Sequence, residues 1–136
     1  MTSRFAKISC MAFLVASGLV QAATPCDGFK IKIKNKLADD LVVSTATIEG
    51  AVLEPKGIQK ISKRSESTFT VNKSIDGTIM PVELTFNTMS LPTKKVTLKF
   101  NLKNKGLACI HDGASTEGDL HATSTRLPGS VTYTIK

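Results

Sequence analysis

Both histidines of the chain fall within one polar, glycine-rich segment, residues 111–121. The segment also carries three carboxylates, those of Asp112, Glu117 and Asp119. Imidazole nitrogens and carboxylate oxygens are ligands for zinc and copper, so one hypothesis is a metal site built from His111, Asp112, Asp119 and His121. The spacing of these residues matches no metal-binding signature, however, and polar surface loops commonly have a similar composition.

The same two histidines could also supply the acid and the base of a small hydrolase. The chain contains neither the G-x-S-x-G motif of a nucleophilic serine nor the H-E-x-x-H motif of a metalloprotease. We therefore predict no catalytic residue and no cofactor, and we favour a non-enzymatic protein over an enzyme.

A second set of charged residues consists of lysines that alternate with other residues, mostly apolar: Lys30, Lys32, Lys34, Lys95, Lys99 and Lys103. Alternate residues of a strand share one face, so six ammonium groups would cover one broad face if both segments joined the same sheet. Such a face would attract phosphates, anionic lipid head groups or acidic glycans in a salt-dependent way. A simpler interpretation is that solvent-facing strand positions need polar side chains, and that lysines discourage aggregation through sheet edges.

Aromatic residues are too scarce to suggest a nucleic-acid partner. The chain has no tryptophan and a single tyrosine, Tyr133, whose position in an alternating segment places it on the inward side. Binding of single-stranded nucleic acid usually relies on aromatic side chains that stack on bases. We therefore expect no nucleic-acid partner.

The first residues have the three zones of a secretory signal peptide. Arg4 and Lys7 precede an apolar run over residues 10–20, and Ala22 follows as a small residue at a cleavage site. We predict a signal peptide over residues 1–22, one domain over residues 23–136, and export to the periplasm or the medium. Cleavage would leave 16 of the 18 basic residues and all 11 acids, a net charge of +5. No later apolar run is long enough to predict a transmembrane segment.

The cysteines are consistent with export. Cys10 would leave with the signal peptide, so Cys26 and Cys109 remain as one pair. An even pair in an oxidising compartment predicts a disulfide. A metal-binding pair and two free thiols are the alternatives, but neither has C-x-x-C spacing to support it.

The elements that must position these residues have a period of two, which is typical of strands. Phe29, Ile31 and Ile33 alternate with lysines, and Val96, Leu98, Phe100 and Leu102 repeat the pattern. Turn residues separate such segments, and the pattern predicts strands near residues 29–34, 41–48, 58–62, 67–71, 82–86, 95–103, 107–110, 120–125 and 131–135. The polar segment 111–118 is predicted to be a loop. The expected fold is a single antiparallel β-sandwich, Ig-like or jelly-roll-like, with seven to nine short strands.

Together these features favour an exported, non-enzymatic β-sandwich that binds an anionic cell-surface or host component. The ligand would be a lipid head group or an acidic glycan on the lysine-bearing face. The alternatives are a periplasmic metal-binding protein that uses His111 and His121, or a small secreted hydrolase. Both alternatives require the two histidines to converge in the fold. Neither the strand order nor the oligomeric state follows from the sequence.

Overall fold

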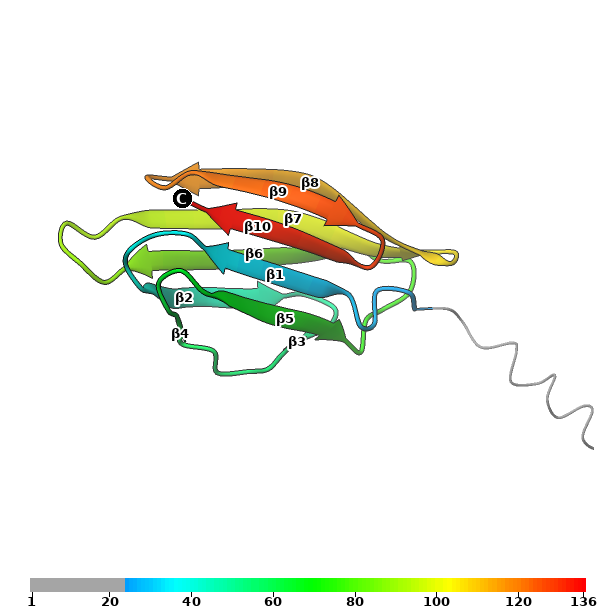
Figure 1. Cartoon of the computed structure of the whole chain (residues 1–136). Helices are drawn as coiled ribbons and strands as arrows, with labels where there is room; N and C mark the ends of the chain where they lie inside the picture. Colours follow the sequence, from blue (N-terminus) through cyan, green and yellow to red (C-terminus); the bar gives the residue numbers. More distant parts are fainter. Residues whose placement is uncertain (1–23) are drawn as a thin grey trace, which may run out of the picture.

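The computed structural model describes residues 24–136, which form an all-β domain (Figure 1). The predicted signal peptide, residues 1–22, lies outside the described residues. Within residues 24–136, no helix is both long enough and apolar enough to cross a membrane. The described part has ten strands: β1 (Lys30–Asn35), β2 (Leu41–Ile48), β3 (Val52–Glu54), β4 (Lys60–Ile61), β5 (Glu66–Asn72), β6 (Met80–Thr88), β7 (Lys95–Lys105), β8 (Ala108–Gly118), β9 (Ala122–Leu127) and β10 (Ser130–Ile135).

The strands form two five-stranded sheets that pack as a sandwich (Figure 1). One sheet, in the order β3-β5-β1-β10-β9, is mixed, because β1 and β10 run parallel while its other pairs are antiparallel. The other sheet, in the order β4-β2-β6-β7-β8, is antiparallel. The predicted β-sandwich is confirmed, whereas the expectations of an entirely antiparallel fold and of seven to nine strands are wrong. Alternation shows which side chains face inward, but it does not show in which direction a neighbouring strand runs.

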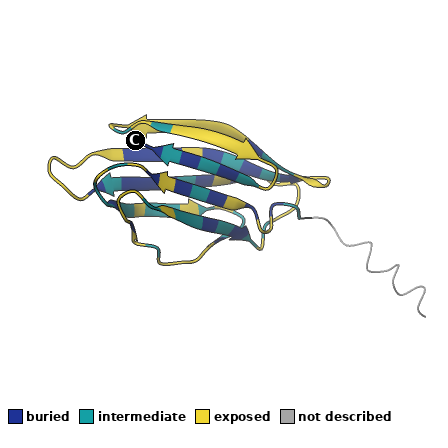
Figure 2. Cartoon of the chain, in the orientation of Figure 1, coloured by how far each residue is buried: buried dark blue, intermediate teal, exposed yellow. Residues whose placement is uncertain are grey.

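The core lies between the two sheets and consists of the alternating residues that the sequence pattern singles out. Ile31 and Ile33 of β1 and Leu98 and Leu102 of β7 are fully buried. Figure 2 shows the alternation of buried and exposed positions along these strands. Tyr133, at 1% exposure, is buried on the inward side of β10 as expected. Burial of apolar surface is the main force that holds the sheets together.

The segment that the sequence predicts to be a loop is instead part of a strand. β8 runs without interruption from Ala108 to Gly118 and pairs with β7. The pairing shifts register between Lys99 and Asn101, opposite Gly113, whose φ of 65° suits a bulge. Gly118 lies so close to β7 that a Cβ atom there would be 2.3 Å from the Lys95 carbonyl oxygen. Backbone pairing with a strong amphipathic neighbour thus makes a strand of a sequence with little strand propensity.

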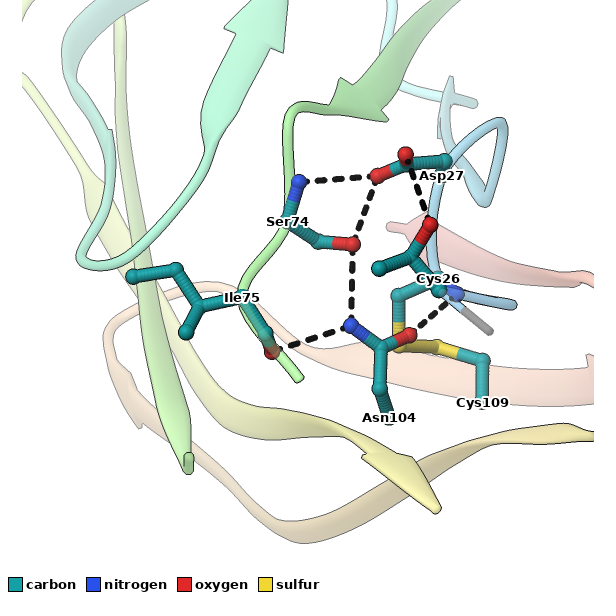
Figure 3. The surroundings of a disulfide bond; sticks show 7 residues. Cys26, Asp27, Ser74, Ile75, Asn104 and Cys109 are labelled. Carbon is teal, nitrogen blue, oxygen red and sulfur yellow. Dashed lines mark hydrogen bonds between the residues drawn. A yellow bond between two sulfur atoms is a disulfide. The ribbon is translucent and has the colours of Figure 1, made fainter. Parts of the chain in front are cut away.

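A disulfide between Cys26 and Cys109 links the residues just before β1 to the start of β8, and so joins the two sheets (Figure 3). The predicted pairing is therefore confirmed. Beside it, the buried side chain of Asn104 accepts a hydrogen bond from the Cys26 backbone N–H at 2.6 Å. Its amide nitrogen donates to the Ser74 hydroxyl at 2.9 Å and to the Ile75 carbonyl at 3.0 Å. This network ties three distant segments to the disulfide-bearing end of the sandwich.

Candidate functional site

The structure places the two predicted lysine rows on different sheets. Lys30, Lys32 and Lys34 lie on β1 of the mixed sheet, and Lys95, Lys99 and Lys103 lie on β7 of the antiparallel sheet. The residues that alternate with each row point into the core, so the two rows lie on opposite outer surfaces of the sandwich. The single six-lysine face is therefore not formed, because the condition that both strands share a sheet is not met.

The lysines of β7 are interleaved with acids of the neighbouring strands. Glu83 of β6 lies directly opposite Lys99. On the other side, β8 places Glu117 opposite Thr97 and Asp112 opposite Asn101, on the same outer face. Directly opposed residues of paired strands share a face, so these carboxylates compensate the row of positive charge. This surface is therefore a poor candidate for binding an anion.

The lysines of β1 are flanked mainly by hydroxyl groups. Lys32 lies between Thr68 of β5 and Thr132 of β10. Lys30 has Thr70 and Ser130 in the equivalent positions, and its ammonium group lies 3.3 Å from the Thr70 hydroxyl. We call this surface the hydroxyl–lysine face and define it by Lys30, Lys32, Lys34, Thr68, Thr70, Ser130, Thr132 and Thr134.

Two acids adjoin the hydroxyl–lysine face at its margins. Glu66 lies opposite Lys34 at one end of β1, and Glu54 lies on the edge strand β3, where its carboxylate accepts a hydrogen bond from the Asn72 amide. Among residues 24–136 the one ion pair within 4.0 Å joins Lys60 and Asp40. In that part of the chain, neither the lysines of β1 nor those of β7 have a carboxylate within ion-pair distance, so the two rows differ only in how many acids lie near them. On β1, one lysine, Lys34, has an acid directly opposite it.

Positive charge extends past the end of β1 into a shallow cleft. The cleft is lined by Lys34, Asn35, Lys36, Arg64, Ser65 and Glu66, so it contains three basic residues and one acid. Asn35 is buried there and donates to the carbonyl oxygens of Asp39 and Ile61, which makes its role structural. Sequence reasoning missed both this extension and the hydroxyl rows. The Thr-x-Thr spacing at residues 68–70, 123–125 and 132–134 was the available signal for the hydroxyl rows.

The two histidines do not converge. His111 points into the core from β8, where it is 8% exposed, whereas His121 is exposed beyond the far end of that strand. His111 and Gly118 are seven positions apart along β8, a distance of about 23 Å in a strand. Asp112 lies on the outer face of β8, and a carboxylate oxygen of Asp119 accepts a hydrogen bond from the Lys95 backbone at 3.2 Å. No group of three or more potential metal ligands occurs in the described part of the chain.

His111 has the surroundings of a structural histidine. Its ring stacks on Phe100 with centroids 4.7 Å apart, and its Nε2 atom lies 3.3 Å from the Tyr133 hydroxyl. Burial lowers the pKa of His111, and the nearby positive charge of Arg126 lowers it further. Burial also raises the pKa of Tyr133 to about 12. These groups are therefore neutral at physiological pH, and they form no solvent-accessible acid–base pair with His121.

Fold and surface together define a disulfide-linked β-sandwich with one row of lysines that is set mainly among hydroxyl groups and has acids at its margins. No protein-family model and no curated protein matches the chain.

Proposed function

We propose that the protein is an exported, non-enzymatic binding domain that binds an acidic glycan on the hydroxyl–lysine face. The observation that carries this proposal is the row of three ammonium groups on β1, in which Lys30 and Lys32 have hydroxyl residues on both sides and only Lys34 has an acid, Glu66, directly opposite. Ammonium groups attract sulfate and carboxylate, and threonine hydroxyls both donate and accept hydrogen bonds with sugar hydroxyls. The net charge of +5 that remains after removal of residues 1–22 favours association with the same class of partner.

An acidic glycan fits this face better than an anionic bilayer does. Surfaces that lie on membranes usually combine basic residues with apolar side chains that enter the acyl region. The strands of the mixed sheet have one large exposed apolar residue, Leu127, and it stands at the end of edge strand β9. The rest of the outer face offers hydroxyl and ammonium groups, which would remain in water.

The dimensions of the face suggest how a glycan would lie. Successive lysines on β1 are two residues apart, so their Cα atoms are spaced by about 6.6 Å and the row spans about 13 Å. Neighbouring hydroxyl rows are about 4.8 Å away on either side. A linear polyanion that lies along β1 would meet three ammonium groups in turn and could contact hydroxyls on both flanks.

The two lysine rows supply a test with a matched control. We expect a heparin-derived octasaccharide to bind the wild-type protein at 50 mM salt and more weakly at 300 mM salt, as measured by calorimetry. Replacement of Lys30, Lys32 and Lys34 by glutamine should weaken binding about 10- to 100-fold, because each exposed ionic contact contributes up to about 1 kcal/mol. The triple replacement of Lys95, Lys99 and Lys103 by glutamine removes the same charge from the opposite surface and should have a smaller effect.

Equal losses in the two triple variants would show that net charge rather than this face determines binding, and the proposal would be wrong. Absence of binding at low salt would also contradict it. Vesicles that contain phosphatidylserine provide the lipid comparison. Stronger binding to vesicles than to the octasaccharide would assign the face to a membrane instead.

Export is the second part of the proposal. It is supported by the signal-like pattern of residues 1–22 and by a disulfide of the kind that persists in oxidising compartments. Expression of the full chain in a Gram-negative host should yield a periplasmic product that begins at Ala23, which intact mass would establish. A product that stays in the cytoplasm with residues 1–22 attached would contradict this assignment.

A further inference from the structure

One side of the sandwich is formed by two long edge strands, β8 and β9, which belong to different sheets (Figure 1). β8 has 11 residues and β9 has six, whereas the opposite edges, β4 and β3, have two and three. Every residue of β8 from Asp112 to Gly118 is exposed, and Figure 2 shows β8 and β9 as largely exposed ribbons. Proteins usually shorten an edge, interrupt it with a bulge or place charged residues or proline on it. β8 has the bulge at Gly113 and two acids on its outer face, but it is 11 residues long and contains no lysine or proline.

A groove runs between these two strands. It consists of two clefts, each lined by residues of both β8 and β9, that have His111 and Arg126 in common. Beyond these two residues, one cleft is lined partly by Phe29, Ile110 and Leu127. The other is lined by Gly113, Ala114 and Ser124 and by one acid, Asp112. The groove therefore offers both apolar and polar contacts beside an unpaired strand.

Arg126 bridges the groove. Its Nη1 atom donates a hydrogen bond of 2.5 Å to the His111 carbonyl oxygen. That carbonyl is therefore accessible from the open edge of β8. In the described part of the chain Arg126 has no carboxylate within ion-pair distance. A guanidinium group has five N–H donors, and it pairs most strongly with a carboxylate in two-point contact. Arg126 thus caps an edge carbonyl and retains donors for an anion.

We propose that an extended segment of a partner protein pairs with the open edge of β8 and places a carboxylate side chain against Arg126. Backbone hydrogen bonds to the free edge would provide affinity, as in other cases of strand addition. The small residues Gly113, Ala114 and Ser115 allow a second backbone to approach. The carboxylate provides the selectivity, since Arg126 is the one arginine or lysine among the residues that line the groove, and the lining acid Asp112 belongs to the outer face of β8.

A second copy of the chain is a poorer occupant than an acidic partner. The acids of β8, Asp112 and Glu117, lie on its outer face because they oppose Asn101 and Thr97 of β7. Antiparallel pairing of β8 with its own copy would keep all four carboxylates on that outer face, where like charges repel. Self-pairing of β8 would supply no carboxylate to Arg126, because the Arg126 side chain reaches β8 from the inner side of the sheet.

The test uses a fluorescent, end-blocked nine-residue peptide of threonine, serine and valine with one central glutamate. We expect anisotropy to show binding to the full domain, and hydrogen exchange to show slowed amides within residues 109–118. A peptide with glutamine in place of glutamate should bind about tenfold more weakly. A peptide N-methylated on the amides that face β8 should not bind, because it cannot form the backbone ladder.

Arg126→Gln should reduce affinity for the glutamate peptide to that for the glutamine peptide, and Lys99→Gln on the outer face of β7 is the matched charge control. Thermal unfolding would establish that both variants are folded. If Arg126→Gln does not fold, the glutamate-to-glutamine comparison on the wild-type protein still decides the role of the carboxylate. Lack of binding, equal binding of the N-methylated peptide, or protection of β8 through self-association would each overturn the proposal.

Discussion

Removal of the disulfide is the perturbation whose magnitude follows most directly from the structure. Cys26 and Cys109 are separated by 83 positions, so the bond closes most of the described chain into one loop. In the chain-entropy relation for a loop of this length, the cross-link destabilises the unfolded state by about 4.5 kcal/mol at 25 °C. Cys26 is fully buried, so alanine is preferable to serine, which would place a hydroxyl in the core.

We therefore expect the variant with both Cys26→Ala and Cys109→Ala to lose about 4–5 kcal/mol of unfolding free energy. For a domain of about this size, the melting temperature would fall by roughly 15–20 °C. Urea unfolding followed by circular dichroism would measure the change. The double variant should also have a larger m-value, because its unfolded chain exposes more surface than the cross-linked one.

The wild-type protein with its disulfide reduced is the matched control, because it loses the same constraint without any substitution. Reduced wild type and double variant should unfold at similar urea concentrations. A double variant that stays within about 1 kcal/mol of the oxidised wild type would refute the expected entropic role of the bond. Loss of stability in the variant but not in the reduced protein would assign the effect to packing around Cys26.

Three further predictions concern single residues. Burial lowers the pKa of His111 in the folded state, so the unfolded state takes up a proton more readily and the free energy of unfolding should fall as the pH drops below about 6.5. Urea midpoints at pH 7.5 and 5.5 measure this change. His111→Phe should reduce the difference between the two midpoints more than His121→Gln does. Asn104→Ala should cost about 2–3 kcal/mol because it leaves the buried Cys26 N–H without its acceptor, and a loss below about 0.5 kcal/mol would contradict the role assigned to this network. Gly118→Ala should destabilise more than Gly57→Ala, because both have positive φ but only Gly118 lies against backbone; equal melting temperatures would contradict the close approach.

Much of the fold follows from local pattern. The alternation in residues 29–34 and 95–103 correctly predicts which side chains enter the core, and the cysteine count correctly predicts the Cys26–Cys109 bond. The pattern fails at residues 111–118, where mainly polar and glycine residues form most of β8. That segment is a strand because β7 offers it backbone partners on both sides of the bulge, and a backbone partner cannot be seen in the composition of the segment itself.

The sequence by itself determines which residues point outward, and hence that Lys30, Lys32 and Lys34 form one row and Lys95, Lys99 and Lys103 another. Only the tertiary structure decides that these rows lie on opposite surfaces, that hydroxyls flank most of one while acids are interleaved with the other, and that His111 and His121 are far apart. The physical reason is that the direction of a side chain depends on its own strand, whereas its neighbours depend on pairings between segments many residues apart. The candidate site is a property of those pairings.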